Sequence, residues 1–408
     1  MTLQVSYMGT KKQLASYVSD LVDNSKPGPF LDLFSGVCAV GESIRSGRQV
    51  WCNDIQLFSY NIARAFFTSK APSLTSIDAL RLIVDDYDRN FSLLQKKYGR
   101  HLLKERSLIK KKSIRDFKKF NNELLYHENC PEFELERRRL SRAPLTKPYR
   151  LFTMSYSGGY LGLEQCFQID SLRFGIDQAL EKRFINPDEH RWMILALCQS
   201  MSKVATTSGH FAQYLQIKSS NKRFFHGQRQ RFIMEEWLSA LDTFAPIGNH
   251  KWRAQNKVFQ QDSVSLLKRL SKKDNKPSVI YADPPYTSDQ YSRYYHLYET
   301  LLRYDYPAVS SKGLYRHDRF RSDFSLQSKV ESAFENLIQS CSNLGTELII
   351  SYPENGLLED SKQKLLKMLR KNFSNVKVAH EIPYKHSSLG ASKGKEKYNV
   401  TEILYKAK

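Results

Sequence analysis

The first sixty residues carry two kinds of hydrophobic pattern. Apolar residues at helical spacing predict a helix within residues 7–24. A Pro-Gly-Pro breaker then leads into the short apolar run FLDLF at residues 30–34, which is typical of a buried strand. A helix from about Glu42 and a second short strand over residues 50–55 follow. Together these elements predict a strand–turn–helix–strand unit of an α/β domain.

Strand-like apolar runs return in the last third of the chain. Two of them flank a Ser/Gly/Lys-rich stretch, which predicts an antiparallel hairpin with a long basic tip. The predicted elements are strands at residues 257–262, 278–283 and 347–351, helices at 264–270 and 364–370, and hairpin strands at 376–382 and 399–405.

Composition narrows the class of protein. The chain has 408 residues, of which 41% are apolar, enough for a sizeable core. Its 63 Lys and Arg against 42 Asp and Glu give a net charge of +21, which favours a polyanionic partner such as nucleic acid. Six Cys without a CxxC pair argue against a disulfide scaffold or a zinc ribbon, and no metal site is predicted. The chain lacks a signal-peptide layout and an apolar run of about 18 residues, so we expect a reduced, cytoplasmic protein.

The middle of the chain departs from the α/β pattern. Residues 95–150 hold 17 Lys and Arg against 7 Asp and Glu. Such a run is often a solvated helix surface, but in a chain of this total charge it favours a DNA-facing insertion. Residues 151–160 indicate a turn-rich loop. We predict one domain formed by residues 1–65 and 246–408, interrupted by a largely helical insertion at residues 66–245.

The clearest chemical signal is Asp283-Pro284-Pro285-Tyr286 at the end of a predicted strand. Neither proline can donate an N–H to a strand ladder, so the motif leaves the Asp carboxylate, backbone carbonyls and the Tyr ring at the carboxyl edge. In open parallel sheets, ligands bind at that edge. A carboxylate and a carbonyl can accept both hydrogens of an exocyclic amine, and the Tyr ring can stack on the attached base.

A glycine-containing turn follows the first predicted strand. Gly36 permits a tight turn, and Gly41 permits close packing of the next helix. The turn lacks the middle glycine that lets a pyrophosphate approach, so dinucleotide binding is disfavoured. Asp54, an acid at the end of the second strand, can bind ribose hydroxyls. The pattern is typical of a site for an adenosine-type cofactor without phosphates.

These motifs, taken in order, resemble those of DNA adenine-N6 methyltransferases, and more specifically the group typified by Dam methylase. The early Tyr-x-Gly-x-Lys segment is part of the resemblance, and Cys38 departs from it where Gly or Ser is usual. The matching segments are Tyr7–Lys11, Asp32–Gly36, Asp54, a basic insertion, Ser208–Ala212, Gln261–Asp262, Asp283–Tyr286 and Tyr291–His296.

The resemblance implies a Rossmann-like methyltransferase sheet, S-adenosylmethionine as cofactor and double-stranded DNA as substrate. It implies that Asp283, Pro284 and Tyr286 hold the target adenine. The residues implied for the cofactor are Tyr7, Lys11, Asp32, Phe34, Gly36, Asp54, Asp262 and Asp283. DNA contacts are expected from Arg293 and His296, which follow the Asp-Pro-Pro-Tyr motif, and from Lys393 and Lys395 in the hairpin tip. A prokaryotic or phage-encoded enzyme is expected, serving restriction–modification or DNA protection, with a separately encoded restriction endonuclease as a candidate partner.

Two alternatives stay open at this point. The same chemistry could act on adenine in RNA, although an insertion large enough to read a duplex groove favours DNA. The chain could also be a catalytically inactive DNA-binding relative, which the intact Lys11, Asp54, Asp283 and Tyr286 disfavour. A methyltransferase of protein glutamine usually shows Asn before Pro-Pro-Tyr, where this chain has Asp283.

Overall fold

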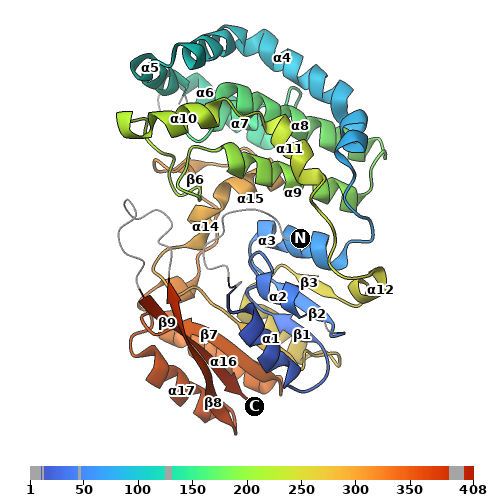
Figure 1. The fold of residues 1–408 in the computed structure, drawn as a ribbon, viewed down its shortest axis with the longest axis vertical. Coiled ribbons are helices and arrows are strands. Elements are labelled where there is room, and N and C mark those ends of the chain that lie inside the picture. The colour runs from blue at the N-terminus through green and yellow to red at the C-terminus, as the bar shows by residue number, and fades with distance from the viewer. Residues whose placement is uncertain (1–10, 12, 45–46, 125–130, 386–398) are drawn as a thin grey trace.

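A seven-stranded, mostly parallel sheet organises one end of the molecule (Figure 1). The computed structural model describes all residues except 1–10, 12, 45–46, 125–130 and 386–398. The strand order is β3-β2-β1-β4-β7-β9-β8, and only β9 runs against its neighbours. The strands are β1 (Phe30–Asp32), β2 (Val50–Asn53), β3 (Lys257–Phe259), β4 (Val279–Ala282), β7 (Glu347–Pro353), β8 (Val376–Lys385) and β9 (Asn399–Ala407).

Helices cover both faces of the sheet because successive strand residues point to opposite sides. In β1, Phe30 packs into the core under α1, α2 and α3, whereas Leu31 packs into the core under α13, α16 and α17. The predicted Rossmann-like α/β fold with a C-terminal antiparallel hairpin is confirmed. The helices are α1 (Ala15–Asp23), α2 (Ala39–Ser43), α3 (Leu57–Thr68), α13 (Ser263–Ser271), α16 (Val330–Asn343) and α17 (Ser361–Asn372).

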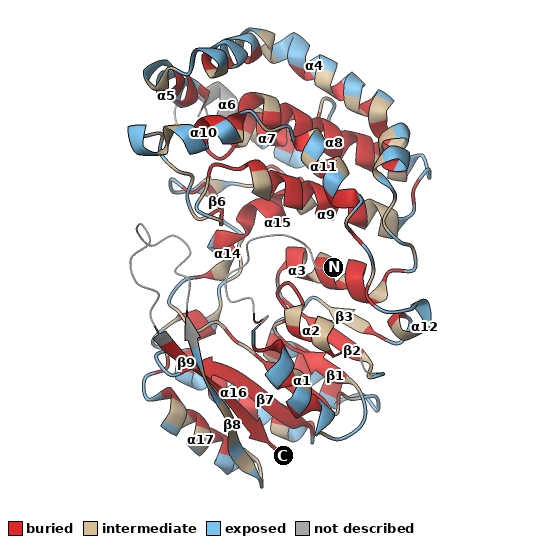
Figure 2. Ribbon diagram, in the orientation of Figure 1, coloured by how far each residue is buried: buried red, intermediate tan, exposed pale blue. Residues whose placement is uncertain are grey.

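A second, helical lobe lies beyond α3 at the other end of the molecule (Figure 1). Its centre is formed by α8 and α9, which are buried along most of their length (Figure 2). The lobe comprises α4 (Ser76–Lys111), α5 (Ile114–Leu124), α6 (Pro131–Arg142), α7 (Leu151–Ser155), α8 (Leu163–Glu181), α9 (Pro187–Val204), α10 (Lys222–Arg229) and α11 (Ile233–Leu241), and α12 (His250–Arg253) leads back to the sheet.

The chain returns to the helical lobe once more after β4. Helix α14 (Tyr291–Tyr294) leaves the sheet, and α15 (His296–Arg303) packs against α9 and α3. A two-stranded hairpin, β5 (Val309–Ser310) with β6 (Tyr315–Arg316), follows before a short 3-10 turn at residues 323–325. Helix α15 and the β5–β6 hairpin therefore add to the lobe that residues 66–245 were predicted to form.

The segment at residues 151–160 differs from its prediction as a turn-rich loop. Its first five residues form α7. Asp170 in α8 accepts hydrogen bonds from the backbone N–H groups of Phe152 (2.9 Å) and Thr153 (2.8 Å), which satisfies the start of this short helix. The acceptor comes from another helix, so local sequence pattern could not indicate it. Among the described helices, none is long and apolar enough to span a membrane.

Candidate active site

A cavity of about 400 Å³ opens at the carboxyl ends of β1, β2 and β4. This is the edge at which open parallel sheets bind ligands. Its lining combines the turn after β1, the acid after β2 and the Asp-Pro-Pro-Tyr motif after β4. The fold brings these segments together, although the motif lies more than 200 positions after the other two. The lining residues that the sequence predicted are Lys11, Asp32, Phe34, Gly36, Asp54, Asp262, Asp283, Pro284 and Tyr286.

The turn after β1 has the backbone shape that its glycines predicted. Gly36 has φ +49°, in the left-handed region that favours glycine. A Cβ at Gly41 would lie 3.2 Å from the ring of Phe67, so this glycine permits close packing of α2. Cys38 also takes a positive φ, +62°, so the departure from Gly falls at a position where Gly would be less strained.

Two buried acids face the cavity from β1 and β2. The Asp54 carboxylate accepts hydrogen bonds from the N–H groups of Gly36 and Gln56, both at 2.9 Å, and burial raises its pKa to about 6. Burial, together with the charges of Asp283 and Asp54, raises the pKa of Asp32 to about 8. Oδ1 of Asp32 is buried without a hydrogen-bond partner in the described structure. The wall of the cavity therefore favours a cationic ligand.

A buried ammonium group links the Asp-Pro-Pro-Tyr motif to the end of the chain. Lys11 Nζ lies 3.3 Å from Asp283 Oδ1, 2.7 Å from Glu402 Oε1 and 5.1 Å from the centre of the Tyr286 ring. Burial lowers the pKa of Lys11, but the charges of Asp283 and Glu402 more than offset this and raise it above its usual value. Burial also raises the pKa of Asp283, to about 7, because Lys11 offsets the burial only in part and Glu402 adds repulsion.

Glu402 and Ser351 are residues of this network that the sequence reasoning missed. Glu402 lies on β9 and is 1% exposed, and its Oε1 accepts a hydrogen bond from the Ser351 hydroxyl on β7. The one available signal was a carboxylate inside the predicted strand stretch V-T-E-I-L. A buried acid in a central strand calls for a partner.

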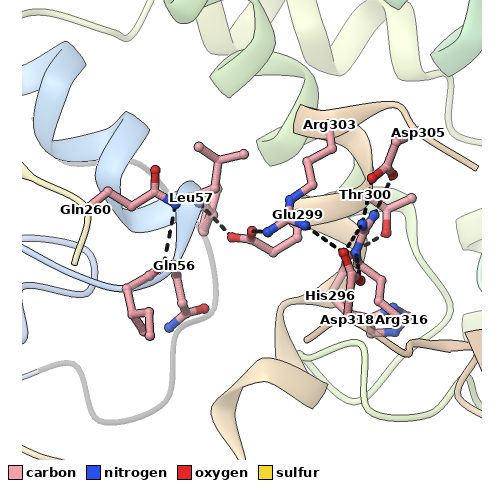
Figure 3. Close-up of polar contacts among 12 residues, drawn as sticks. Gln56, Leu57, Gln260, His296, Glu299, Thr300, Arg303, Asp305, Arg316 and Asp318 are labelled. Carbon is pink, nitrogen blue, oxygen red and sulfur yellow. Dashed lines mark hydrogen bonds and ion pairs between the residues drawn. The ribbon is translucent and has the colours of Figure 1, made fainter. Parts of the chain in front are cut away.

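Another buried acid, Glu299 of α15, links the helical lobe to the side of the sheet that carries the cavity (Figure 3). Its Oε1 accepts the backbone N–H of Phe58 (2.9 Å) in the first turn of α3, and burial raises its pKa to about 7. Helix α3 starts directly after Asp54 and Gln56, so Glu299 steadies the segment that presents Asp54. This residue was also missed from the sequence.

The remaining site predictions have four different outcomes. Asp262 lines the cavity and caps α13 by accepting the N–H of Ser265 (2.9 Å). Arg293 is exposed on α14. His296 differs from its prediction as a DNA contact, because it is 1% exposed and its Nε2 lies 2.9 Å from the Phe211 carbonyl oxygen. Tyr7, Lys393 and Lys395 lie outside the described residues.

The fold and this cavity define a Rossmann-like α/β protein with an Asp-Pro-Pro-Tyr site at the carboxyl edge of its sheet. Residues 7–156 and 239–352 match the D12 class N6 adenine-specific DNA methyltransferases, and the chain belongs to this family. The finer resemblance to the Dam group stays a prediction.

Named relatives agree with this assignment. The chain is 27% identical over 402 residues to the type II methyltransferase M.FokI of Planomicrobium okeanokoites, and 24% identical over 401 residues to the modification methylase StsI of Streptococcus sanguinis. These matches cover 97% of this chain but 51% and 50% of the two relatives, so the chain spans about half their length. The type II methyltransferase M.NlaIII of Neisseria lactamica is 23% identical over 362 residues, 87% of this chain and 85% of that protein.

Proposed function

We propose that this chain methylates N6 of adenine in double-stranded DNA, with S-adenosylmethionine as the methyl donor. The observation that carries the proposal is the Asp283 carboxylate, which contacts the buried Lys11 in the wall of an acidic cavity that Tyr286 also lines. Membership of the D12 family supports the substrate and the target atom. The names of the relatives, a type II methyltransferase and a modification methylase, support a role in restriction–modification. A separately encoded restriction endonuclease is the partner that we propose for this role.

The chemistry of the cavity fits this cofactor. S-adenosylmethionine carries a sulfonium and an ammonium cation, and the cavity offers Asp32, Asp54 and Asp283. The unpartnered buried oxygen of Asp32 is an acceptor without a donor, which a bound cation or N–H group would supply. Asp54 would hold the ribose hydroxyls, and Phe34 and Asp262 would flank the adenine ring. When bound, the cofactor supplies a methyl group that is already strongly electrophilic, so the protein needs no covalent intermediate.

The protein's own contribution is then to present the adenine amine. A base inside a duplex is out of reach, so it must be flipped into the cavity. Asp283 and the carbonyl of Pro284 would accept the two N6 hydrogens and favour a pyramidal nitrogen whose lone pair is free. Tyr286 would stack on the ring. A carboxylate with a raised pKa is also a better acceptor than an ordinary aspartate for the proton that leaves N6.

Lys11 keeps this acceptor in place. Its ammonium contacts Asp283 on one side and faces the Tyr286 ring on the other, so both groups that hold the base share one anchor. The anchor is buried, which strengthens these electrostatic contacts relative to water. Catalysis is in this scheme mainly positioning within a preorganised site.

The proposal is tested by single-molecule sequencing of DNA from a methylation-free host that expresses the chain or its Asp283→Ala variant. Asp20→Ala, an exposed acid on α1, is the matched control. We expect N6-methyladenine at one short motif with the wild type and the control, and none with Asp283→Ala. Wild-type protein that binds S-adenosylmethionine but leaves DNA unmodified would favour an RNA substrate. Wild-type protein that binds DNA but neither binds S-adenosylmethionine nor methylates DNA would favour an inactive relative.

A further inference from the structure

Five arginines and five acids lie in the segment that follows the Asp-Pro-Pro-Tyr motif, residues 287–325. The positive charges of two of these arginines are paired with aspartate carboxylates. Arg316 contacts Asp305 at 2.6 and 2.7 Å and Asp318 at 2.9 and 3.0 Å, and Arg303 contacts Asp318 at 2.8 Å (Figure 3). These contacts fix the base of the β5–β6 hairpin.

The other three arginines, Arg293, Arg319 and Arg321, have no carboxylate within ion-pair distance among the described residues. The two remaining acids nearby that could serve them are engaged elsewhere, since Asp323 pairs with Lys329 (3.2 Å) and Asp289 contacts Tyr294. The local acids therefore neutralise the structural arginines and leave these three as excess positive charge.

Two of the three unpaired arginines lie over one ring, and the third is close enough to repel them. The guanidinium groups of Arg293 and Arg319 each lie 5.9 Å from the centre of the Tyr315 ring. Arg319 also donates to the Ser292 hydroxyl (3.2 Å). Burial and repulsion from Arg293 and Arg321 lower the pKa of Arg319, which shows that these like charges are close enough to disfavour one another. An anion between them would relieve that repulsion.

The platform under this cluster is rigid. The Tyr315 hydroxyl donates to the Ala212 carbonyl, and a Cβ at Gly313 would lie only 2.4 Å from the same oxygen. The neighbouring Phe211 carbonyl accepts the Tyr160 hydroxyl (2.5 Å). The Ser208–Ala212 segment, which is part of the sequence resemblance, therefore packs against the β5–β6 hairpin through the Ala212 carbonyl. Such support limits the side-chain entropy lost when an arginine binds a ligand.

The cluster also reaches the cavity. Arg321 is one of the lining residues and is exposed to solvent, which places it where the cavity opens, and Arg293 is exposed as well. Gln290 fixes this stretch to the start of α14 by accepting the N–H of Ser322 (2.7 Å) and donating to its carbonyl (3.1 Å). A nucleotide whose base has entered the cavity remains attached to its strand, so its two phosphates must lie at the entrance.

We infer that Arg293, Arg319 and Arg321 form a phosphate-binding site for the DNA strand that carries the flipped adenine. The inference rests on the proposed function and goes beyond it by assigning Arg319 and Arg321. Guanidinium groups suit this task because their planar N–H groups match phosphate oxygens in pairs. Three cations exceed what the single carboxylate of the cofactor requires, so the strand backbone is the better match.

The test compares Arg319→Gln/Arg321→Gln with Arg370→Gln, which removes an exposed charge on α17 at the outer face of the sheet. The probes are a duplex with one unpaired adenine and a fully paired duplex, titrated by fluorescence anisotropy at several salt concentrations. Each lost phosphate contact lowers the slope of log affinity against log salt by about 0.9, so the double variant should lose about 1.8 and bind about 60-fold more weakly at 0.1 M salt. Affinity for S-adenosylmethionine should not change.

Three outcomes would overturn the inference. In the first, the salt slope of the double variant equals that of Arg370→Gln although the wild type methylates DNA. This result would leave the proposed function intact. A second is weakened S-adenosylmethionine binding with an unchanged salt slope, which would assign the cluster to the cofactor carboxylate. In the third, wild-type protein binds neither duplex, and the proposed function fails along with the inference.

Discussion

Replacement of Glu402 by Gln should move the pH dependence of methyl transfer to lower pH. Glu402 and Asp283 contact the same Lys11 ammonium, at 2.7 and 3.3 Å. Gln has the shape of Glu and can still bond to Lys11 and Ser351, so the change removes a charge with little change in volume. Asp283 loses a negative neighbour and keeps Lys11, which makes its ionised form easier to reach.

The size of the shift follows from the geometry. The two carboxylate oxygens are at most about 6 Å apart, the sum of their distances to Nζ. Coulomb's law with an effective dielectric constant of about 20 gives about 3 kcal/mol at that separation, or about two pKa units. Because the pKa of Asp283 is raised to about 7, the variant should titrate near 5. Asp32 and Tyr281 also face this site and are unchanged by the substitution.

The assay is kcat/KM for DNA at saturating S-adenosylmethionine between pH 5 and 9. If ionised Asp283 is required, wild-type activity at pH 6 should be about one tenth of that at pH 8, and the Glu402→Gln value about nine tenths. Glu347→Gln is the control, since Glu347 is another buried acid of the sheet, 3.6 Å from the buried Lys406. It should lower stability without moving the profile. An unchanged profile in Glu402→Gln would refute the assignment of Glu402 as the group that tunes Asp283.

Two further substitutions probe the same architecture through stability. Asp32→Asn should raise the melting temperature of the ligand-free protein increasingly between pH 5 and pH 8, because the folded pKa of about 8 lies above the unfolded value near 4 and wild-type stability falls as pH rises through that window. Thermal shift assays at fixed ionic strength measure this, and a pH-independent difference would contradict it. Gly313→Ala should lower the melting temperature by several degrees and weaken DNA binding, because its Cβ would lie 2.4 Å from a backbone oxygen. Gly227→Ala on α10, which has open space around it, should be neutral or slightly stabilising, and equal losses in both variants would rule out this steric explanation.

The sheet and the cavity could be read from the sequence because their determinants are local. The strands that frame the cavity are short, largely apolar runs that end in a recognisable turn or acid, as in FLDLF before Gly36 and the run before Asp283. Parallel strands place these ends at one edge, so residues far apart in sequence meet without any need to know the packing of the helices.

The missed residues depend on partners that no local pattern reveals. Glu402 acquires its role from Lys11, which lies 391 positions earlier. Glu299 acquires its role from a backbone N–H of α3 that is 241 positions away. His296 was expected to contact DNA because it follows the Asp-Pro-Pro-Tyr motif, yet it is buried against a backbone carbonyl. In each case tertiary packing decides whether a polar side chain faces ligand, solvent or backbone.

The interleaving of the two lobes has a consequence for biosynthesis. Strand β1 needs β4 as its neighbour, but Phe30 and its register partner Val279 are 249 positions apart. At typical translation speeds of about 5–20 residues per second, β1 and β2 wait on the order of 10–50 s on the ribosome before β4 is made. During that interval the helical lobe can fold while β1 and β2, which are largely apolar, lack β4 as a neighbour. Nascent-chain binding by chaperones should therefore concentrate on β1 and β2, and translation pauses before β4 should lower the yield of active protein.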